Sequence, residues 1–402
     1  MYARYGARDD HDEGSLVSER AVGLFAGIGG LELGLHANGW STELLCEIDP
    51  GAQAVLRQRF PGVELHSDVK KLRSLPAATE LVAAGFPCQD LSQAGRTVGI
   101  TGTRSGLVDE VFRLVKRKNG PRWLLLENVP FMLQLGRGAA MRHITAALEE
   151  LGYTWAYRVV DARAFGLPQR RRRVVLLASR IEDPREVLYG EDASPAEDFD
   201  ATDAACGFYW TEGIRGLGWA VNAVPTLKGG STLGIASPPA VRLRSGELVT
   251  PGVVDAERLQ GFDQEWTLPA NDVPGSRTGH RWKLVGNAVN VRMASWIGQR
   301  LANPIRYDGT PDKPLQPGET WPMAAWGRDG VAHRAPVSAW PVQDTYTNIE
   351  NFLTESKPLS ARATAGFLKR ARIGNLRFVP GFLDDVAEHL AVVGGDPAKV
   401  VA

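Results

Sequence analysis

Leu24-Phe25-Ala26-Gly27-Ile28-Gly29-Gly30 is the stretch that decides the fold, because it leads from an apolar strand pattern at 21–25 into a helical pattern. Its glycines permit a tight turn between strand and helix, and the free amides at the start of the helix can hold a polar or anionic group. Glu47 ends the next strand pattern, where an acidic side chain commonly accepts hydrogen bonds from ribose hydroxyls. The pattern therefore predicts a nucleoside site in an α/β fold.

The residues of this loop distinguish between two kinds of nucleoside ligand. A dinucleotide-binding loop would have a glycine at position 32, and this chain has Glu32 there. A carboxylate is an unfavourable neighbour for a pyrophosphate, so the sequence favours a nucleoside without phosphates, and S-adenosylmethionine is the best candidate. An NAD-binding dehydrogenase and a purely structural glycine-rich turn stay open as alternatives.

Apolar strands alternate with amphipathic helices along residues 21–180, which is the pattern of a parallel sheet covered by helices on both faces. The expected strands are 21–25, 43–47, 81–84, 123–126, 154–160 and 173–178, and helices are expected at 52–59, 107–116 and 140–151. The acidic, proline-containing stretch 182–203 then predicts a surface linker. Residues 207–252 are rich in Gly, Pro and Thr, and they predict a small, irregular β-containing module.

The last hundred residues have a different texture. A coil rich in Pro, Gly and Trp begins near Asn303, and helix-like stretches at 346–355, 360–373 and 381–393 predict a mainly helical C-terminal extension. Five basic residues gather around the second of these stretches: Arg362, Lys369, Arg370, Arg372 and Arg377. A solvated helix face explains them most simply, and an extra contact with DNA or a partner is the alternative.

Composition limits the class of protein. The 402 residues allow two or three domains, and 44% hydrophobic with 23% charged residues is ordinary for a globular chain. No apolar run approaches the roughly 18 residues of a membrane span, and the acidic N-terminus resembles no signal peptide. Three widely spaced cysteines form neither a disulfide ladder nor a metal cluster, which favours a reducing cytoplasm. The net charge is zero, so a nucleic-acid partner would require basic residues that are concentrated locally.

A candidate nucleophile follows the apolar run at 81–84, in the sequence Gly85-Phe86-Pro87-Cys88-Gln89. Gly and Pro force a turn at the end of a strand, and the carboxyl ends of parallel strands are where open α/β sheets place their chemistry. Because most free cysteines are small buried hydrophobic residues, Cys88 alone does not establish catalysis.

Together these features resemble the cytosine-C5 DNA methyltransferases. LFAGIGG (24–30) is similar to the family's cofactor loop, GFPCQDLSQAG (85–95) to its nucleophile loop and ENV (127–129) to its acid motif. GLPQRRRR (166–173) resembles the Gln-x-Arg-x-Arg motif, and ERLQGF (257–262) and VGNAV (285–289) resemble the last two blocks. The six blocks follow in the family order and cover about residues 20–302. Such an ordered set is stronger evidence for the resemblance than a lone Pro-Cys-Gln would be.

The resemblance implies a covalent mechanism, because carbon 5 of cytosine is too weak a nucleophile to accept a methyl group unaided. Cys88 would attack C6 as a thiolate, and Glu127 would act as the acid at the N3 edge. Arg173 would polarise O2, Arg171 would support phosphate and loop positions, and Asn128 would order the turn. C6 is stacked inside a duplex, so the target base would be flipped out. No metal is expected.

The resemblance also implies S-adenosyl-L-methionine as the cofactor and S-adenosyl-L-homocysteine as its product. Glu47 would bind the ribose, Ile48 would flank the adenine where the family commonly has an aromatic residue, and Asn287 would hold the methionine end. Asp68 would reach the adenine amino group, with a helix N-cap as the alternative. The expected cofactor contacts are Phe25, Gly27, Gly29, Gly30, Glu47, Ile48, Asp68, Val69, Pro87, Leu107 and Asn287.

Family members insert a target-recognition domain between the Gln-x-Arg-x-Arg motif and ERLQGF, and PTLKGGSTLG (225–234) would be its DNA-facing loop. Arg242 and Arg244 would join Lys228 in phosphate contacts, while threonine and serine side chains would reach base edges. The expected DNA contacts are Gln89, Ser92, Arg104, Gln169, Thr226, Lys228, Ser231 and Thr232.

The expected fold is therefore α/β: a Rossmann-like methyltransferase sheet, an inserted small β-containing recognition domain and a mainly helical C-terminal extension. The expected organisation is a flexible tail at 1–19, a catalytic domain at 20–180 plus 255–302, a recognition domain at 181–254 and an extension of unknown role at 303–402. The expected protein is a cytoplasmic, nucleoid-associated monomer that acts on double-stranded DNA, with a restriction or defence nuclease as a candidate partner and no membrane association. A tRNA methyltransferase of the same fold and a DNA-binding protein without catalysis stay open as alternatives.

Overall fold

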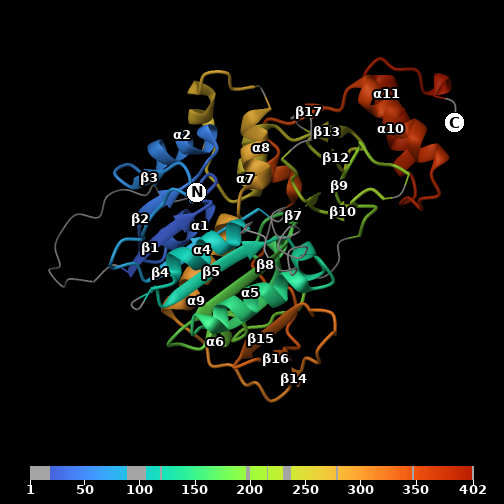
Figure 1. Ribbon diagram of the computed structural model, residues 1–402. Coiled ribbons are helices and arrows are strands. Elements are labelled where there is room, and N and C mark those ends of the chain that lie inside the picture. The colour runs from blue at the N-terminus through green and yellow to red at the C-terminus, as the bar shows by residue number, and fades with distance from the viewer. Residues whose placement is uncertain are drawn as a thin grey trace.

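The computed structural model describes residues 19–87, 106–117, 120–195, 200–214, 216–229, 237–277, 279–345 and 348–400. Within these residues, a ten-stranded sheet has the order β14-β16-β15-β6-β8-β5-β4-β1-β2-β3, and a separate five-stranded sheet has the order β10-β9-β12-β13-β17. The small sheet lies beside one end of the large one, as Figure 1 shows. The expected α/β fold with a small β-containing module is confirmed.

Five neighbouring strands of the large sheet are parallel. Four of them lie where the sequence predicts, apart from small shifts at their ends, and the short strand β3 was not predicted. These strands are β1 (Glu19–Leu24), β2 (Trp40–Cys46), β3 (Glu64–His66), β4 (Leu81–Ala84) and β5 (Trp123–Asn128). The helices between or after them are α1 (Gly30–His36), α2 (Pro50–Arg59), α4 (Leu107–Val115) and α5 (Ala139–Glu150).

The prediction of a parallel sheet is wrong at β8 (Arg172–Ser179). This strand lies between β5 and β6 (Thr154–Asp161) and is antiparallel to both of them. The connection from β6 to β8 holds only the single-turn helix η3 (Ala162–Ala164) and the short strand β7 (Gln169–Arg170). It is too short for the crossover of a dozen or more residues that a parallel pair requires.

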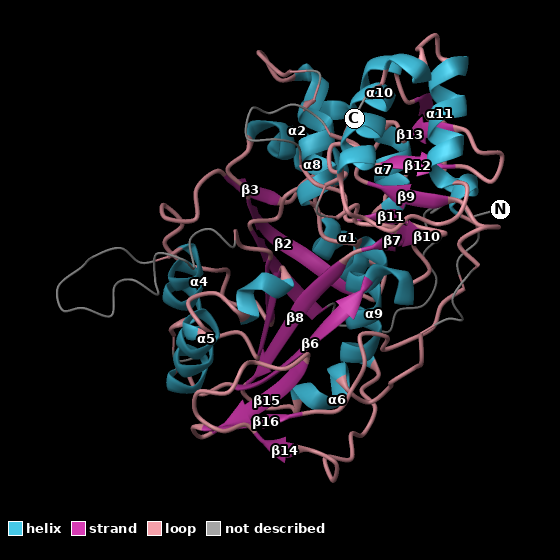
Figure 2. Ribbon diagram, turned by 90° about the vertical axis from the view of Figure 1, so that its right-hand side faces the viewer, coloured by secondary structure: helices cyan, strands magenta, loops and turns pink. Residues whose placement is uncertain are grey.

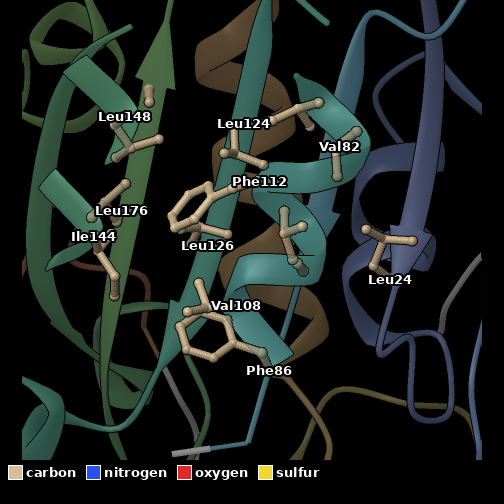
Figure 3. Packing of buried hydrophobic residues seen from close by; sticks show 14 of the residues in the cluster. Leu24, Val82, Phe86, Val108, Phe112, Leu124, Leu126, Ile144, Leu148 and Leu176 are labelled. Carbon is tan, nitrogen blue, oxygen red and sulfur yellow. The ribbon is translucent and has the colours of Figure 1, made fainter. Parts of the chain in front are cut away.

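Helices cover both faces of the large sheet, so its central strands are buried on both sides. Every residue of β4 is buried, with Val82 in the cluster on one face and Leu81 in the cluster on the other. Figure 3 shows the first cluster, in which Phe112 and Ile144 pack on side chains from the central strands. Figure 2 shows α4 and α5 on one side of the sheet and α6 (Pro184–Leu188) and α9 (Val291–Ala302) on the other. Burial on both faces explains why these strands read as continuous apolar runs.

The small sheet is built from strands of the expected recognition module, together with one strand from the C-terminal segment. Its strands are β9 (Cys206–Phe208), β10 (Ala220–Val221), β12 (Ala240–Arg242), β13 (Leu248–Thr250) and β17 (Lys357–Pro358). A two-stranded ribbon of β7 and β11 (Val224–Pro225) connects this region to the catalytic domain. The helices α7 (Val253–Leu259) and α8 (His280–Asn287) carry the last two sequence blocks and lie between the two sheets in Figure 1.

The C-terminal extension contains more helix than strand, as expected, but its first half also adds three strands to the large sheet that the sequence did not predict. β15 (Ala324–Arg328) pairs with β6, and β16 (Val331–Arg334) and β14 (Lys313–Pro314) continue the large sheet outward. The second half does contain the expected helices, α10 (Ala361–Ile373) and α11 (Phe382–Val392), which pack on the small sheet. The remaining short helices are η2 (Pro130–Leu133), η4 (Leu268–Asp272), η5 (Ile349–Phe352) and η6 (Pro397–Lys399).

Among the described residues, no helix is long and apolar enough to cross a membrane.

Candidate active site

A cavity of about 460 Å³ opens where strands β1, β2 and β4 end. Its volume lies in the range of small-ligand sites. Every predicted cofactor residue except Gly29 and Gly30 lines this cavity. The lining residues are Phe25, Gly27, Cys46, Glu47, Ile48, Asp49, Ala52, Asp68, Val69, Lys70, Gly85, Pro87, Leu107, Leu284 and Asn287.

Glu47 is held in place by the glycine loop, and part of its hydrogen-bonding capacity stays free. Its Oε2 accepts a hydrogen bond from the amide of Gly27 at 2.8 Å, and its Oε1 accepts one from the amide of Asp49 at 2.8 Å. A carboxylate has about four acceptor positions, so each oxygen keeps one for a ligand. Burial raises the pKa of Glu47, and the backbone hydrogen bonds oppose this shift.

The three loop glycines have different roles. Gly27 has a φ of +57°, and an added Cβ would meet nothing within 4 Å, so the backbone is open to the cavity at this point. An added Cβ would lie 2.3 Å from the ring of Phe60 at Gly29 and 2.3 Å from the carbonyl oxygen of Val289 at Gly30. Gly29 and Gly30 are therefore required for close packing behind the loop, and their expected backbone contact with a cofactor stays a prediction.

Glu32 does not line the cavity, where its carboxylate was expected to repel a pyrophosphate. Its side chain is buried beneath β1, and a Cβ added at Gly23 would lie 2.0 Å from its Oε1. Burial raises the pKa of Glu32 to about 8, and neither carboxylate oxygen has a hydrogen-bond partner among the described residues. A carboxyl group in this position packs under the strand, so the expected repulsion of a pyrophosphate by Glu32 has no basis in this geometry.

Sequence reasoning missed Asp49 and Leu284, which also line the cavity. Asp49 caps α2 through the amide of Gly51 at 2.9 Å, and it also contacts His280 Nε2 at 3.0 Å and Lys283 Nζ at 3.3 Å. These contacts bring α8 to the cavity, and they contribute to a lowered pKa of the Asp49 carboxyl. The helix start at Asp49-Pro50 and the position of Leu284 one turn before Asn287 were the available signals.

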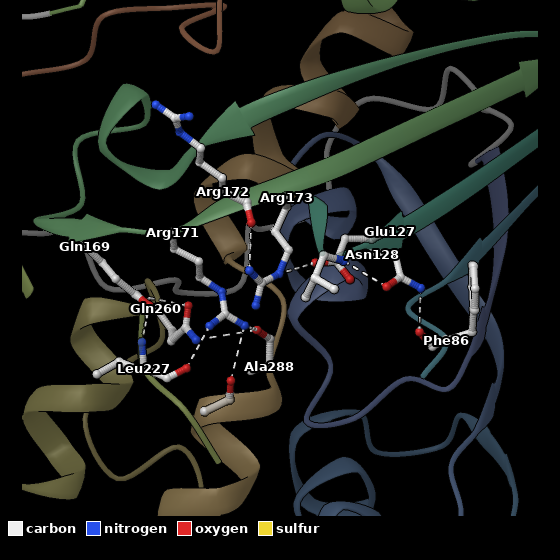
Figure 4. A network of polar contacts seen from close by, with 12 residues as sticks. Phe86, Glu127, Asn128, Gln169, Arg171, Arg172, Arg173, Leu227, Gln260 and Ala288 are labelled. Atoms are coloured by element: carbon white, nitrogen blue, oxygen red, sulfur yellow. Dashed lines mark hydrogen bonds and ion pairs between the residues drawn. The ribbon is translucent and has the colours of Figure 1, made fainter. Parts of the chain in front are cut away.

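Figure 4 shows a second polar cluster, formed around Glu127 and the arginines of the strand β8 region. Arg173 Nε and Glu127 Oε1 form an ion pair at 2.9 Å, and both side chains are buried. Burial raises the pKa of Glu127, while the guanidinium groups of Arg173 and Arg171 oppose the shift. Glu127 therefore keeps its proton up to a higher pH than an ordinary glutamate does.

Gly85 connects the two clusters. It lines the cavity, and a Cβ built on it would lie 3.6 Å from Glu127 Oε2. Asn128 secures the same segment, because its Nδ2 donates to the carbonyl of Phe86 at 2.9 Å and its Oδ1 accepts from Val129 at 2.8 Å. The expected ordering of the turn by Asn128 agrees with these contacts.

Arg171 is buried and joins three segments of chain. Its guanidinium donates to the carbonyl of Leu227 at 3.1 Å, of Gly286 at 3.2 Å and of Ala288 at 2.7 Å. This geometry supports the loops, and it leaves no surface through which Arg171 could reach a phosphate.

Gln169 is also buried, which corrects its expected role in DNA contact. Its amide nitrogen donates to the carbonyl of Leu259 at 2.9 Å, and its oxygen accepts from the amide of Leu227 at 3.1 Å. The side chain thus ties ERLQGF to the recognition loop.

Some of the other expected DNA contacts lie within the described residues and the rest lie outside them. Thr226 donates its hydroxyl to the carbonyl of Arg170 at 2.8 Å, and the exposed Lys228 places Nζ 3.8 Å from the ring centre of Tyr209. Of the expected phosphate contacts, Arg242 is ion-paired with Asp385. The remaining expected DNA contacts lie outside the described residues, namely Gln89, Ser92, Arg104, Ser231 and Thr232, and so does the expected nucleophile Cys88.

Known proteins resemble the chain over nearly its whole length. Residues 20–205 match the family model "C-5 cytosine-specific DNA methylase". The chain is 50% identical to the type II methyltransferase M2.BsuMI of Bacillus subtilis (strain 168), over 91% of this chain and 97% of that protein. It is 27% identical to the type II methyltransferase M.MspI of Moraxella sp, over 70% of each chain.

Among solved structures, the methyltransferase EhMeth of Entamoeba histolytica aligns with a TM-score of 0.50 at 13% identity, over 71% of this chain and 98% of that one. At this identity the likeness concerns the fold alone. The identity to M2.BsuMI and the match to the family model lead to one conclusion: the chain belongs to the C-5 cytosine-specific DNA methylases and is a DNA (cytosine-5-)-methyltransferase.

Proposed function

We propose that this enzyme methylates a cytosine flipped out of a short, specific double-stranded DNA sequence, and that Cys88 forms a covalent bond to C6 of that base. Membership of the family implies S-adenosylmethionine as the methyl donor. The observation that carries the proposal is the adjacency of the buried Glu127–Arg173 pair to the cavity that contains Glu47, with Gly85 forming part of the wall between them.

The chemistry of the cavity fits this donor. Glu47 retains acceptor positions for two ribose hydroxyls, and Phe25, Val69 and Leu284 provide apolar surface. Three acidic side chains line the cavity, Glu47, Asp49 and Asp68, against one lysine, Lys70, and this excess of carboxylates favours a positively charged sulfonium over a phosphate. The bound donor would supply the methyl group.

Neither cysteine in the described part of the chain is a suitable nucleophile, which supports Cys88 by elimination. Cys46 and Cys206 are both buried, and burial raises the pKa of Cys46 to about 12 and that of Cys206 to about 11. Both thiols therefore stay protonated near pH 7, whereas a thiolate is the nucleophilic form. In the proposed reaction, the Cys88 sulfur bonds to C6 and the electron pair of the C5–C6 bond becomes available at C5. After methyl transfer, C5 loses its proton and the bond to sulfur breaks.

Glu127 supplies the acid for this step. Addition of sulfur to C6 places negative charge on N3 and O2, and a carboxyl whose pKa is raised by burial can donate a proton to N3. Arg173, paired with Glu127 at 2.9 Å, is close enough to stabilise charge on O2 of the same ring. At the Watson–Crick edge, Glu127 thus transfers the proton and Arg173 stabilises the charge.

Target recognition would depend on the small sheet and the loop that follows β11. Lys228 would contact phosphate, and Thr226, Ser231 and Thr232 would contact base edges. The recognition domain would extend over 181–254, between the catalytic parts 20–180 and 255–302. A monomer suffices for this arrangement.

The names of the relatives support a biological role. M2.BsuMI and M.MspI are named type II methyltransferases, which supports a modification role in a bacterial restriction or defence system, with a cognate nuclease as partner. Such an enzyme would work in the cytoplasm on nucleoid DNA.

Bisulfite sequencing of genomic DNA tests the proposal. A host that expresses the chain should acquire 5-methylcytosine at one short sequence context, and the same host with Cys88→Ser should not. Unmethylated DNA in both hosts, or equal methylation in both, would overturn it. A tRNA substrate would appear instead as methylated cytosine in RNA from the same cells.

A further inference from the structure

The two C-terminal helices are part of the small sheet's core. On one face of this sheet, the ring of Phe208 in β9 lies 5.0 Å from the ring of Phe367 in α10 and 5.2 Å from that of Phe382 in α11. Leu248 of β13 is buried in the same cluster. The sheet could not cover this apolar face without residues that lie more than one hundred positions later in the chain.

Polar contacts fix the same arrangement. Arg242 of β12 forms an ion pair with Asp385 of α11. The buried His389 accepts a hydrogen bond from the amide of Leu248 through Nδ1 at 3.2 Å, and it donates from Nε2 to the carbonyl of Leu359 at 2.9 Å. The recognition sheet and the segment 357–392 therefore form one packed unit.

The outer face of this unit carries positive charge on one helix. Arg362 and Lys369 lie two turns apart on α10, Arg377 follows the helix, and all three are exposed. None of the three forms an ion pair with a described carboxylate. The acidic residues of the helix pair lie on α11, namely Asp384, Asp385 and Glu388, and Asp385 is engaged by Arg242.

The end of α10 is connected to the segment that follows β9. Arg370 donates to the carbonyl of Trp210 at 2.7 Å and to that of Glu212 at 2.9 Å. Trp210 directly follows Tyr209, whose hydroxyl donates to the carbonyl of Thr226 at 2.7 Å and whose ring carries Lys228. One continuous stretch of protein thus runs from the expected DNA loop to the basic helix.

We infer that the segment 357–400 completes the recognition domain, and that Arg362, Lys369 and Arg377 bind the phosphate backbone of the duplex beyond the methylated sequence. This inference rests on the proposed DNA-methylating function. A helix of 13 residues is about 20 Å long, which corresponds to about 6 base pairs of DNA. The contact should therefore enlarge the footprint without adding sequence information, because phosphates carry none.

The test compares salt dependence of DNA binding on duplexes of two lengths. The triple variant Arg362→Ala, Lys369→Ala and Arg377→Ala removes the proposed contacts. A matched triple variant, Arg306→Ala, Lys313→Ala and Arg328→Ala, removes the same charge from exposed positions outside the small sheet and α10. Fluorescence anisotropy with a 12-base-pair and a 30-base-pair duplex measures affinity as a function of salt, with the full chain and no methyl donor.

The α10 variant should bind the long duplex with a salt slope lower by about 0.9 for each lost phosphate contact, or about 2.7 in all, while binding of the short duplex changes little. The matched variant should retain the wild-type slope. Equal slopes for the α10 variant and wild type would overturn the inference, as would an equal reduction in the matched variant. Binding is measured without catalysis, so failure of the chain to methylate DNA would count against the proposed function and leave this result interpretable.

Discussion

Glu47 is predicted to provide a large part of the affinity for the methyl donor, and Glu47→Ala measures that part. In the structure each carboxylate oxygen accepts one backbone hydrogen bond at 2.8 Å and keeps a free acceptor position towards the cavity. Hydrogen bonds to a charged group contribute about 1.5–3 kcal/mol. Because 1.36 kcal/mol corresponds to a tenfold change, we expect affinity to fall by about 10- to 150-fold.

Isothermal titration calorimetry with S-adenosylhomocysteine measures this loss directly. Glu43→Ala is the matched control, because Glu43 lies on β2, the strand that Glu47 follows, and pairs with Arg20 outside the cavity. Thermal unfolding of both variants separates a loss of affinity from a loss of folding. Unchanged binding in Glu47→Ala, or the same decrease in Glu43→Ala, would refute the assignment of Glu47 to the ribose.

The donor affinity measured by the same calorimetry should change with pH in a definite direction. Burial raises the pKa of Glu47, so its carboxylate gains a proton at a higher pH than an ordinary glutamate does. Protonation removes the charge that strengthens the ribose hydrogen bonds. Donor affinity should therefore decrease as the pH falls towards this raised pKa, and an affinity that is constant down to pH 4.5 would contradict the role.

Three further predictions concern buried groups around the site. Glu127→Gln keeps the shape of the side chain but cannot transfer a proton, so methyl transfer should slow by about 10²- to 10⁴-fold, and wild-type turnover would remove Glu127 from the mechanism. Burial raises the pKa of Glu32 to about 8, so its ionisation opposes folding: the free energy of unfolding should decrease from pH 5 to pH 8. Glu32→Gln should reduce this decrease, and chemical denaturation that shows identical pH profiles would refute it. Gly30→Ala would place a Cβ 2.3 Å from the carbonyl oxygen of Val289, so it should destabilise the fold by about 1–3 kcal/mol, whereas Gly216→Ala, which meets nothing within 4 Å, should not. Equal melting temperatures for the two glycine variants would show that the close approach is not required.

Much of the catalytic domain was predictable, because local patterns determine it. The strand at 81–84 is a continuous apolar run bounded by Gly85, and the structure buries every residue of it on one face or the other. The cavity residues follow from the same logic, since Phe25, Glu47, Asp68 and Pro87 all come shortly after strands and parallel strands end at one edge. The antiparallel β8 could also have been predicted from the short connection before it.

Long-range packing was not predictable in this way. Nothing in the local sequence of β15 indicates that it pairs with β6, or that Phe367 and Phe382 cover the small sheet. The three-glycine turn has the right residue types for a cofactor loop, yet Gly29 and Gly30 are small because Phe60 and Val289 lie against them. Gln169 illustrates the same limit, because a polar residue in a basic motif looked exposed and is buried by contacts with Leu227 and Leu259.

The central claim is that Cys88 forms the covalent bond to the target cytosine. A duplex with 5-fluorocytosine at the methylated position blocks release after methyl transfer, because the fluorine cannot leave as the proton does. Incubation with S-adenosylmethionine followed by proteolysis and mass spectrometry identifies the cross-linked peptide. We predict a denaturation-resistant adduct on the peptide that contains Cys88, and none in Cys88→Ser. An adduct on a peptide with Cys46 or Cys206, or one that persists in Cys88→Ser, would contradict the proposed mechanism.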